Sequence, residues 1–233
     1  MIDNYFVLLH QIMIKLWEKS SNWSDDYWLL LLQLYLRKPV GVKPVYSRAM
    51  VGLAMELHIH PQVLFGKLCQ IATLQTPRIE RIWERYGDNP RRLNRAVRLL
   101  REMKGYGHAD EFYEGVEVNE SFEKDFKPVA DDSTWTPVAL ILVLDLYFRL
   151  TPNTMVPETP EIQELSRLLK VRAADVVEVM DIYQHIDPYL NRRDVLFNSL
   201  LGPCSEVWRR YGNSDTERLA ALADELKEYY HGS

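Results

Sequence analysis

The sequence contains one long pattern twice. Residues 23–37 are WSDDYWLLLLQLYLR and residues 135–149 are WTPVALILVLDLYFR, and a constant offset of 112 pairs Trp23 with Trp135. Self-similarity at one fixed spacing is the mark of an internal repeat. We therefore predict that the chain folds as two tandem copies of one small domain.

The offset extends well beyond these two segments. It pairs five further apolar positions, Leu53 with Leu165, Leu57 with Leu169, Ile59 with Val171, Leu64 with Val176 and Leu68 with Met180. The second copy then gains an insertion at about 189–203, after which IWERYGDN (82–89) aligns with VWRRYGNS (207–214). We predict an N-terminal amphipathic helix at 1–22, a first repeat at 23–104, a linker at 105–134 and a second repeat at 135–233.

Both copies have the pattern of an all-α fold. Apolar residues recur with a period of about 3.6, glycine is scarce, and no long stretch alternates between apolar and polar residues. The first core helix of each copy has its own start signal. Ser24 is the expected N-cap in the first copy, and Thr136 followed by Pro137 is expected to start the helix in the second.

Inside that helix a polar residue precedes an arginine by four positions in both copies, Gln33 before Arg37 and Asp145 before Arg149. Residues four apart share one helix face, so the simplest interpretation is a pair that satisfies a polar group near the core. The alternative, a catalytic carboxylate at Asp145, lacks a second acid or a histidine nearby in the sequence.

A two-helix unit follows in each copy. In the first copy the spacing predicts one helix, a tight turn at 58–60 and a second helix that begins at Pro61. This is the apolar skeleton of a helix-turn-helix, although any two short helices that meet at an angle need a similar pattern. If the unit reads DNA, the residues that could approach base edges are Gln62, Lys67 and Gln70.

Each copy ends in a further helix, and in the first copy this helix carries an arginine row. Asn89 is the expected N-cap and Pro90 the first helical residue. Four arginines fall close to one helix face, namely Arg91, Arg95, Arg98 and Arg101. Such a row can contact phosphates, but a basic face that only meets solvent would show the same pattern.

The second copy differs in charge. Its second helix offers Asp175, Glu178 and Asp181, and its closing helix, ERLAALADELKEYY, is acidic. Phosphate would be repelled by these carboxylates, so we do not expect the second helix pair to bind DNA. We expect this copy to serve as a scaffold or a dimerisation surface.

The net charge of -5 hides regions of different sign. The first repeat, 23–104, has 14 basic and 7 acidic residues, the linker has 2 and 9, and the second repeat has 10 and 15. The linker also interleaves its acidic residues with aromatic ones, among them Phe112, Tyr113, Phe122 and Phe126, and a disordered linker usually carries fewer aromatics. We therefore expect it to dock, with the adjacent arginine row as its partner.

The composition is typical of a soluble cytoplasmic protein. Cys69 and Cys204 lie in unlike contexts and do not suggest a disulfide framework. Residues 1–22 are apolar but lack a basic start and a cleavage site, so we expect a helix rather than a signal peptide. The apolar run at 28–32 is far shorter than a membrane span, so we expect no membrane partner.

The second copy resembles the helical domain that precedes the catalytic module in bacterial HNH-endonuclease-like proteins. The matching residues are Trp135, Asp145, Leu146, Tyr147, Phe148, Leu168, Leu169, Asp187, Pro188 and Trp208. The resemblance implies a helical fold in a bacterial, DNA-associated protein. The chain departs from the family at 170–172, where Lys-Val-Arg replaces Gly-Arg-Thr, and the sequence does not contain the HNH nuclease module.

No sequence pattern indicates a reaction. The chain has no P-loop, no GxSxG motif and no cysteine–histidine nucleophile, and His58 and His60 alone are too few ligands for a metal site. We expect no catalytic residue, no metal and no cofactor, so the protein is predicted not to be an enzyme; an enzyme that acts on a small molecule is the third and least favoured option.

Two functions are left. The first is a DNA-associated accessory or regulatory protein that contacts duplex DNA through the basic first repeat. The alternative is a protein–protein interaction module with no nucleic-acid ligand, which binds a protein partner or forms a homodimer through the second repeat.

Overall fold

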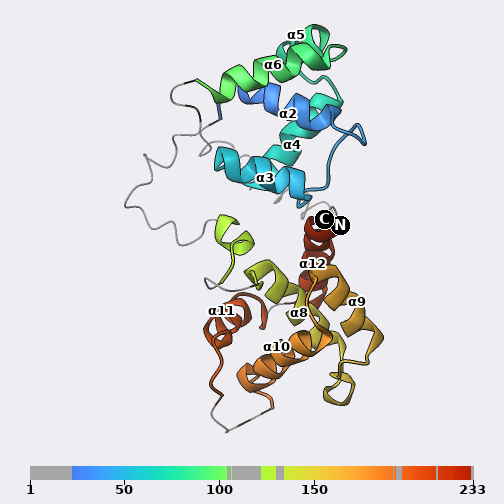
Figure 1. Cartoon of the computed structure of the whole chain (residues 1–233), viewed down its shortest axis with the longest axis vertical. Coiled ribbons are helices and arrows are strands. Elements are labelled where there is room, and N and C mark those ends of the chain that lie inside the picture. Colours follow the sequence, from blue (N-terminus) through green and yellow to red (C-terminus); the bar gives the residue numbers. More distant parts are fainter. Residues whose placement is uncertain are drawn as a thin grey trace, which may run out of the picture. The chain divides into compact units, whose positions relative to one another are not determined.

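The structure is a computed structural model that describes residues 23–103, 106, 122–129, 134–190, 192, 196–213 and 215–231. These residues form helices and connecting loops, with no strand among them, which confirms the all-α fold class (Figure 1). The chain divides into two compact units, 1–117 and 118–233. The helix predicted at 1–22 lies outside the described residues.

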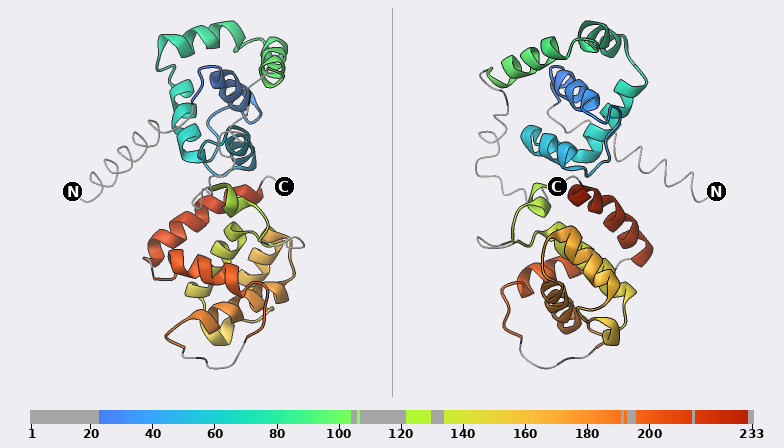
Figure 2. Two further views of the ribbon diagram at one scale, coloured as in Figure 1. Left: turned by 90° about the vertical axis from the view of Figure 1, so that its left-hand side faces the viewer. Right: turned by 45° about the vertical axis from the view of Figure 1, so that its right-hand side comes forward.

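Unit 1 is built around an apolar central helix. Its described helices are α2 (Tyr27–Leu36), α3 (Arg48–Leu57), α4 (Pro61–Ala72), α5 (Pro77–Tyr86) and α6 (Pro90–Arg101). Helix α2 packs against α4, α5 and α6, and α3 packs against α4. In the views of Figures 1 and 2, α2 lies between α4 and α6. A helix this apolar is stable only where neighbours cover it on several sides.

Unit 2 has the same kind of centre. Its described helices are α8 (Pro137–Arg149), α9 (Pro160–Leu169), α10 (Ala173–Ile186), α11 (Leu201–Tyr211) and α12 (Thr216–His231), with the short 3-10 helices η1 (Phe122–Phe126) and η2 (Pro152–Thr154). Helix α8 packs against α9, α10, α11, α12 and η1. Its residues 138–147 are all buried, so α8 is the core helix of this unit.

The helices of the two units follow one another in matching order. Helices α3 and α9 end in residues that adopt left-handed backbone, His58 with φ 52° and Lys170 with φ 59°. The next helices begin three residues later, at Pro61 and Ala173. The tight turn predicted at 58–60 is therefore confirmed, and its counterpart in unit 2 lies at the offset of 112. Descent of both units from one duplicated domain stays a prediction.

A Trp-x-x-Tyr-Gly motif ends α5 and α11. The glycine N–H donates to the tryptophan carbonyl four residues earlier, at 2.7 Å for Gly87 and Trp83 and at 2.6 Å for Gly212 and Trp208. A Cβ atom on Gly212 would lie 2.5 Å from the Trp208 ring, and one on Gly87 would lie 2.8 Å from the Trp83 carbonyl oxygen. Glycine is needed at both positions because the backbone passes directly over the preceding turn.

The two core helices begin differently. Helix α8 starts as predicted, since the Thr136 hydroxyl accepts a hydrogen bond from the Ala139 N–H at 3.2 Å and Pro137 is the first helical residue. Helix α2 begins at Tyr27, so the prediction that Ser24 caps it was wrong. The Ser24 hydroxyl accepts instead from the Asp26 N–H at 3.3 Å, which forms a turn ahead of the helix.

Part of the predicted linker belongs to unit 2. Helix η1 packs on α8, and the buried ring of Phe126 lies 5.0 Å from the ring of Tyr229. Arg210 donates two hydrogen bonds of 2.7 Å to the Asp125 carboxylate. This end of the linker therefore docks on unit 2 and not on the arginine row, while residues 107–121 lie outside the described residues.

Candidate functional site

Helix α6 presents three arginines of the row, Arg91, Arg95 and Arg98, on its outer face. The helix starts as predicted, with the Asn89 side chain accepting from the Arg92 N–H at 3.0 Å and Pro90 in the first position. Its buried residues are Leu93, Val97 and Leu100. Because this apolar face packs on α2, the arginines on the opposite face point away from the core of unit 1.

Arg91, Arg95 and Arg98 are open to a ligand. All three are exposed, and neither Arg91 nor Arg95 has an acidic partner within the part of the chain that the structure describes. Arg98 lies 3.7 Å from Glu102, but the two side chains are 71% and 61% exposed. An ion pair this exposed contributes less than about 1 kcal/mol and is screened by salt, so a polyanion can displace it.

Arg101, the fourth member of the row, is held inside the unit. Its Nε and Nη2 atoms donate to the two carboxylate oxygens of Glu56 on α3, at 2.6 and 2.9 Å. The Tyr106 hydroxyl donates to the same carboxylate. Burial raises the pKa of Glu56, but the hydrogen bonds from Arg101 and Tyr106 outweigh burial and lower it. A phosphate would have to compete with Glu56 for this guanidinium.

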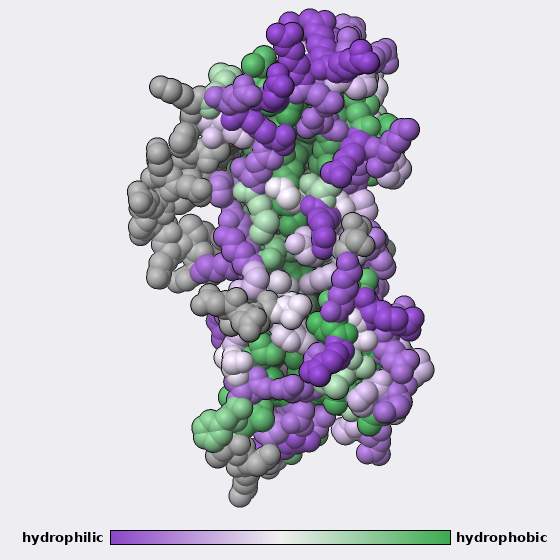
Figure 3. All heavy atoms as spheres, in the orientation of Figure 1, coloured by the Kyte–Doolittle hydropathy of each residue, from purple (hydrophilic) through white to green (hydrophobic). Residues whose placement is uncertain are grey.

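Helix α5 adds arginines that the sequence analysis did not single out. Residues 77–103 contain eight arginines and four acidic residues, whereas residues 201–231 of unit 2 contain four basic and six acidic ones. The guanidinium groups of Arg85 and Arg92 each lie 5.5 Å from the ring of Tyr86, at the turn between α5 and α6. Figure 3 shows hydrophilic side chains covering these two helices. The sequence signal that could have identified these arginines is their high density in the run PRIERIWERYGDNPRR, residues 77–92.

The three residues predicted to approach DNA bases lie on α4. Gln62, Lys67 and Gln70 are all half-buried. The Lys67 ammonium lies 4.4 Å from the ring of Trp23 and 5.4 Å from the ring of Trp28, so two aromatic faces of unit 1 already hold it. Because α2 lies between α4 and α6 (Figure 2), these residues and the arginine row occupy different sides of the central helix.

The acidic residues of α10 make contacts within unit 2. Asp175 accepts from the backbone N–H of Arg172 at 3.1 Å and from its guanidinium at 2.6 Å. Arg192 donates to Asp181 at 2.6 Å, and a side-chain amide in the following connection donates to Glu178 at 2.7 Å. Helix α10, which corresponds to α4, thus carries carboxylates that are already hydrogen bonded, in place of basic groups.

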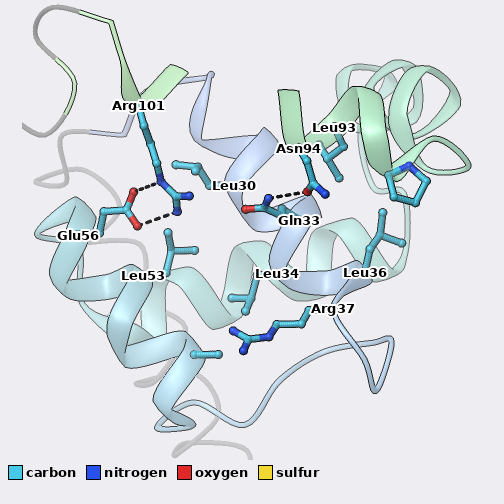
Figure 4. A pocket seen from close by; sticks show the side chains of 12 residues that line it. Leu30, Gln33, Leu34, Leu36, Arg37, Leu53, Glu56, Leu93, Asn94 and Arg101 are labelled. Carbon is cyan, nitrogen blue, oxygen red and sulfur yellow. Dashed lines mark hydrogen bonds and ion pairs between the residues drawn. The ribbon is translucent and has the colours of Figure 1, made fainter. Parts of the chain in front are cut away.

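Unit 1 also contains a groove that no sequence pattern indicated. It has a volume of about 490 Å³ and lies between α2, α3 and α6 (Figure 4). We call it the leucine groove, because its apolar lining includes Leu30, Leu34, Leu36, Leu53 and Leu93. Its polar lining consists of Gln33, Arg37, Glu56, Asn94 and Arg101.

The polar side chains of the leucine groove do not form the predicted pair of Gln33 and Arg37. Gln33 Nε2 donates to Asn94 Oδ1 at 2.8 Å, so the prediction that Gln33 pairs with Arg37 was wrong. Tertiary packing explains the difference, because α6 packs beside α2 and brings the Asn94 amide within hydrogen-bonding distance of Gln33. Arg37 is exposed at the groove and has no acidic partner among the described residues. Figure 4 shows its guanidinium beside Leu34.

In unit 2 the helix that corresponds to α6 packs on two neighbouring helices. Helix α12 packs on both α8 and α9, and its Ala223 and Leu226 are buried. The predicted pair is confirmed here, since Arg149 lies 2.8 Å from Asp145. Burial raises the pKa of Asp145, and Arg149 only partly offsets this effect. At the offset of 112, Leu168 of unit 2 takes the place of Glu56. Unit 2 therefore has no counterpart of the hydrogen-bonded pair formed by Glu56 and Arg101.

The connection between α10 and α11 exposes large apolar side chains. Tyr189 is 90% exposed, Phe197 is 94% exposed and Leu190 is 40% exposed. We call these three residues the apolar loop. The backbone beside them is held, because Asp187 accepts from the Tyr189 N–H at 2.9 Å and Asn198 donates to a carboxylate of α10 at 2.7 Å. Tyr189 and Phe197 thus expose apolar side chains next to backbone that these hydrogen bonds hold in place.

Among the described residues, no cluster of three or more His, Cys, Asp or Glu side chains is placed to hold a metal ion. No described helix combines the length and the apolar character that crossing a bilayer requires. A comparison of the chain with models of protein families, with curated proteins and with solved structures found no match.

Proposed function

We propose that the chain is a non-enzymatic, DNA-associated protein whose unit 1 binds the phosphate backbone of duplex DNA through α6. The observation that carries the proposal is the exposure of Arg91, Arg95 and Arg98 on the face of α6 opposite its buried residues. At a rise of about 1.5 Å per residue they span about 10 Å, or about three base-pair steps of one strand. Guanidinium groups can bind phosphate oxygens in a bidentate manner.

The proposed binding is independent of DNA sequence. Phosphate contacts fix the position of a protein on DNA, whereas base contacts specify the sequence. Lys67 is held against Trp23 and Trp28, and α4 lies across α2 from the arginine row, so base reading by α4 is not part of the proposal. The resemblance of the second repeat to HNH-associated helical domains agrees with a DNA-associated role, and membership of that family is part of the proposal.

The test compares two triple variants with equal changes in net charge. One replaces Arg91, Arg95 and Arg98 by glutamate, and its matched control replaces three exposed arginines of unit 2, Arg167, Arg209 and Arg218, by glutamate. Binding of the full chain to a labelled random duplex is measured by fluorescence anisotropy over a range of salt concentrations.

We expect salt-sensitive binding by the wild type, a loss of at least about 100-fold for the α6 triple, and nearly unchanged binding for the control. Equal losses in both triples would mean that overall charge, and not the α6 surface, governs binding. Absence of salt-sensitive binding by the wild type would refute the proposal for duplex DNA.

A second candidate function is protein–protein interaction without nucleic acid. The observation that favours it is the near-complete exposure of Tyr189 and Phe197 in the apolar loop. Exposed aromatic side chains that are held on a fixed backbone are typical of binding surfaces. DNA binding and protein binding use different surfaces in this molecule, so each can be tested without the other.

A further inference from the structure

We infer that the chain associates head to tail with a second copy of itself, with Tyr189 and Phe197 of one copy docking into the leucine groove of the next. The inference rests on the second candidate function and names the partner. It does not depend on DNA binding, because Arg91, Arg95 and Arg98 lie on the outer face of α6 and do not line the leucine groove.

The apolar loop supplies the inserted side chains. Two aromatic side chains that are 90% and 94% exposed leave a large apolar area in water, and burying such area is the main favourable term in association. The contacts of Asp187 and Asn198 fix the backbone on either side. Less conformational entropy is therefore lost on docking than for a free loop.

The leucine groove supplies the receiving surface. Its volume of about 490 Å³ is open to solvent, and leucines from α2, α3 and α6 line it. The amide pair of Gln33 and Asn94 lies in its wall, where it can hydrogen bond to the hydroxyl of an inserted tyrosine. Figure 4 shows these amides on the same side of the groove as Leu93.

Charge favours a second copy as the partner. Residues 23–104, which hold the leucine groove, have 14 basic and 7 acidic residues, and residues 135–233, which hold the apolar loop, have 10 basic and 15 acidic ones. Arg37 adds a guanidinium without an acidic partner in the described residues at the groove itself. The opposite net charges of the two repeats attract unit 2 of one copy to unit 1 of another and disfavour pairing of like units.

The two surfaces are unlike, so each contact joins two different patches, one from each copy. Helix α12, the counterpart of α6 in unit 2, packs on both α8 and α9, and the proposed contact joins the apolar loop of unit 2 to the leucine groove of unit 1. Such a contact leaves one loop and one groove open at the ends of an open chain of copies, and both are occupied only where the assembly closes into a ring or a reciprocal pair. Wild-type chains should therefore form oligomers that grow with concentration or close into rings.

The test uses complementary defects in the full chain. The loop variant replaces Tyr189 and Phe197 by serine. The groove variant replaces Asn94, an exposed residue that lines the groove, by tryptophan to fill it. A second groove variant, Ala49→Glu, introduces the residue found at the offset position 161 in α9, which a helix of this kind tolerates.

The molar mass of each protein is measured by sedimentation at concentrations up to about 300 µM, alone and in equimolar mixtures. We expect concentration-dependent oligomers for the wild type that weaken with added salt, and association at least about tenfold weaker for each variant alone. Because the loop variant keeps its groove and the groove variant keeps its loop, their mixture should form a one-to-one dimer and nothing larger. Val156→Ser, which removes an exposed apolar side chain elsewhere in unit 2, should behave as wild type.

Three results would overturn the inference. A wild type that stays monomeric throughout the range would show that a second copy is not the partner, and protection of Phe197 in that monomer would point to docking within one chain. Association of either variant with itself at wild-type strength would place the contact elsewhere. A mixture that forms no dimer, although both variants unfold cooperatively at wild-type temperature, would show that loop and groove do not meet.

Discussion

Arg101 and Glu56 join α6 to α3 through two parallel hydrogen bonds of 2.6 and 2.9 Å. The Arg101 side chain is 44% exposed and that of Glu56 is 30% exposed, and Tyr106 donates to the same carboxylate. This contact distinguishes Arg101 from Arg91, Arg95 and Arg98, which have no such partner on α3, although all four lie close to one face of α6.

Arg101 and Arg95 should therefore respond differently to the same substitution. Arg101→Gln should lower the stability of unit 1 by about 1 kcal/mol, because a partly exposed ion pair is lost and Glu56 keeps only Tyr106. Arg95→Gln should leave stability within about 0.5 kcal/mol of wild type and should weaken DNA binding. Urea unfolding and duplex binding, measured on both variants, check the prediction, and a reversed pattern would contradict the assigned roles.

The Glu56 cluster should make unit 1 sensitive to acid. Hydrogen bonds from Arg101 and Tyr106 lower the pKa of Glu56 below its ordinary value of 4.5, so its contribution to stability is present above that pH. The contribution is lost as the pH falls through the lowered pKa, because the unfolded chain then binds the proton more readily. Glu56→Gln should cost stability at neutral pH, and the difference from wild type should shrink toward about pH 3. Urea unfolding at several pH values measures this difference; a gap that stays constant would show that Glu56 does not titrate as described.

The two glycines that follow tyrosine should tolerate no side chain. Gly212→Ala should destabilise unit 2 by about 1–3 kcal/mol, because a Cβ atom would lie 2.5 Å from the Trp208 ring. Gly52→Ala is the matched control in α3, where a Cβ atom meets nothing within 4 Å. This control should be neutral or more stable by about 0.5–1 kcal/mol, because alanine favours helix. Thermal unfolding followed by circular dichroism distinguishes the two substitutions.

Lys67 should contribute to the stability of unit 1 and not to DNA binding. Its ammonium lies over Trp23 and Trp28, and a cation–π contact contributes about 0.5–1 kcal/mol at a partly exposed site. Lys67→Gln should therefore reduce the stability of unit 1 by about that amount and leave duplex affinity within about twofold of wild type. A large loss of DNA affinity in a stable Lys67→Gln protein would restore α4 as a DNA-reading helix.

The local pattern of the sequence determined the helices and many of their ends. The period of apolar residues predicted an all-α chain, and cap residues such as Asn89 and Thr136 marked helix starts, because these signals depend on neighbours a few residues away. The exposed and buried faces of α6 followed from the same spacing. Burial of Asp145 beside Arg149 also followed, since both partners lie on one helix.

Tertiary structure alone decided which polar groups meet across helices. Gln33 bonds to Asn94 and not to Arg37, and Arg101 bonds to Glu56, because α6 packs next to α2 and near α3. Partners 61 and 45 residues apart leave no periodic trace in a single sequence. The leucine groove has the same origin, since it exists only where three separate helices leave space between them. The sequence by itself thus determined the helices and their charge, and packing decided which of those charges remain available to a partner.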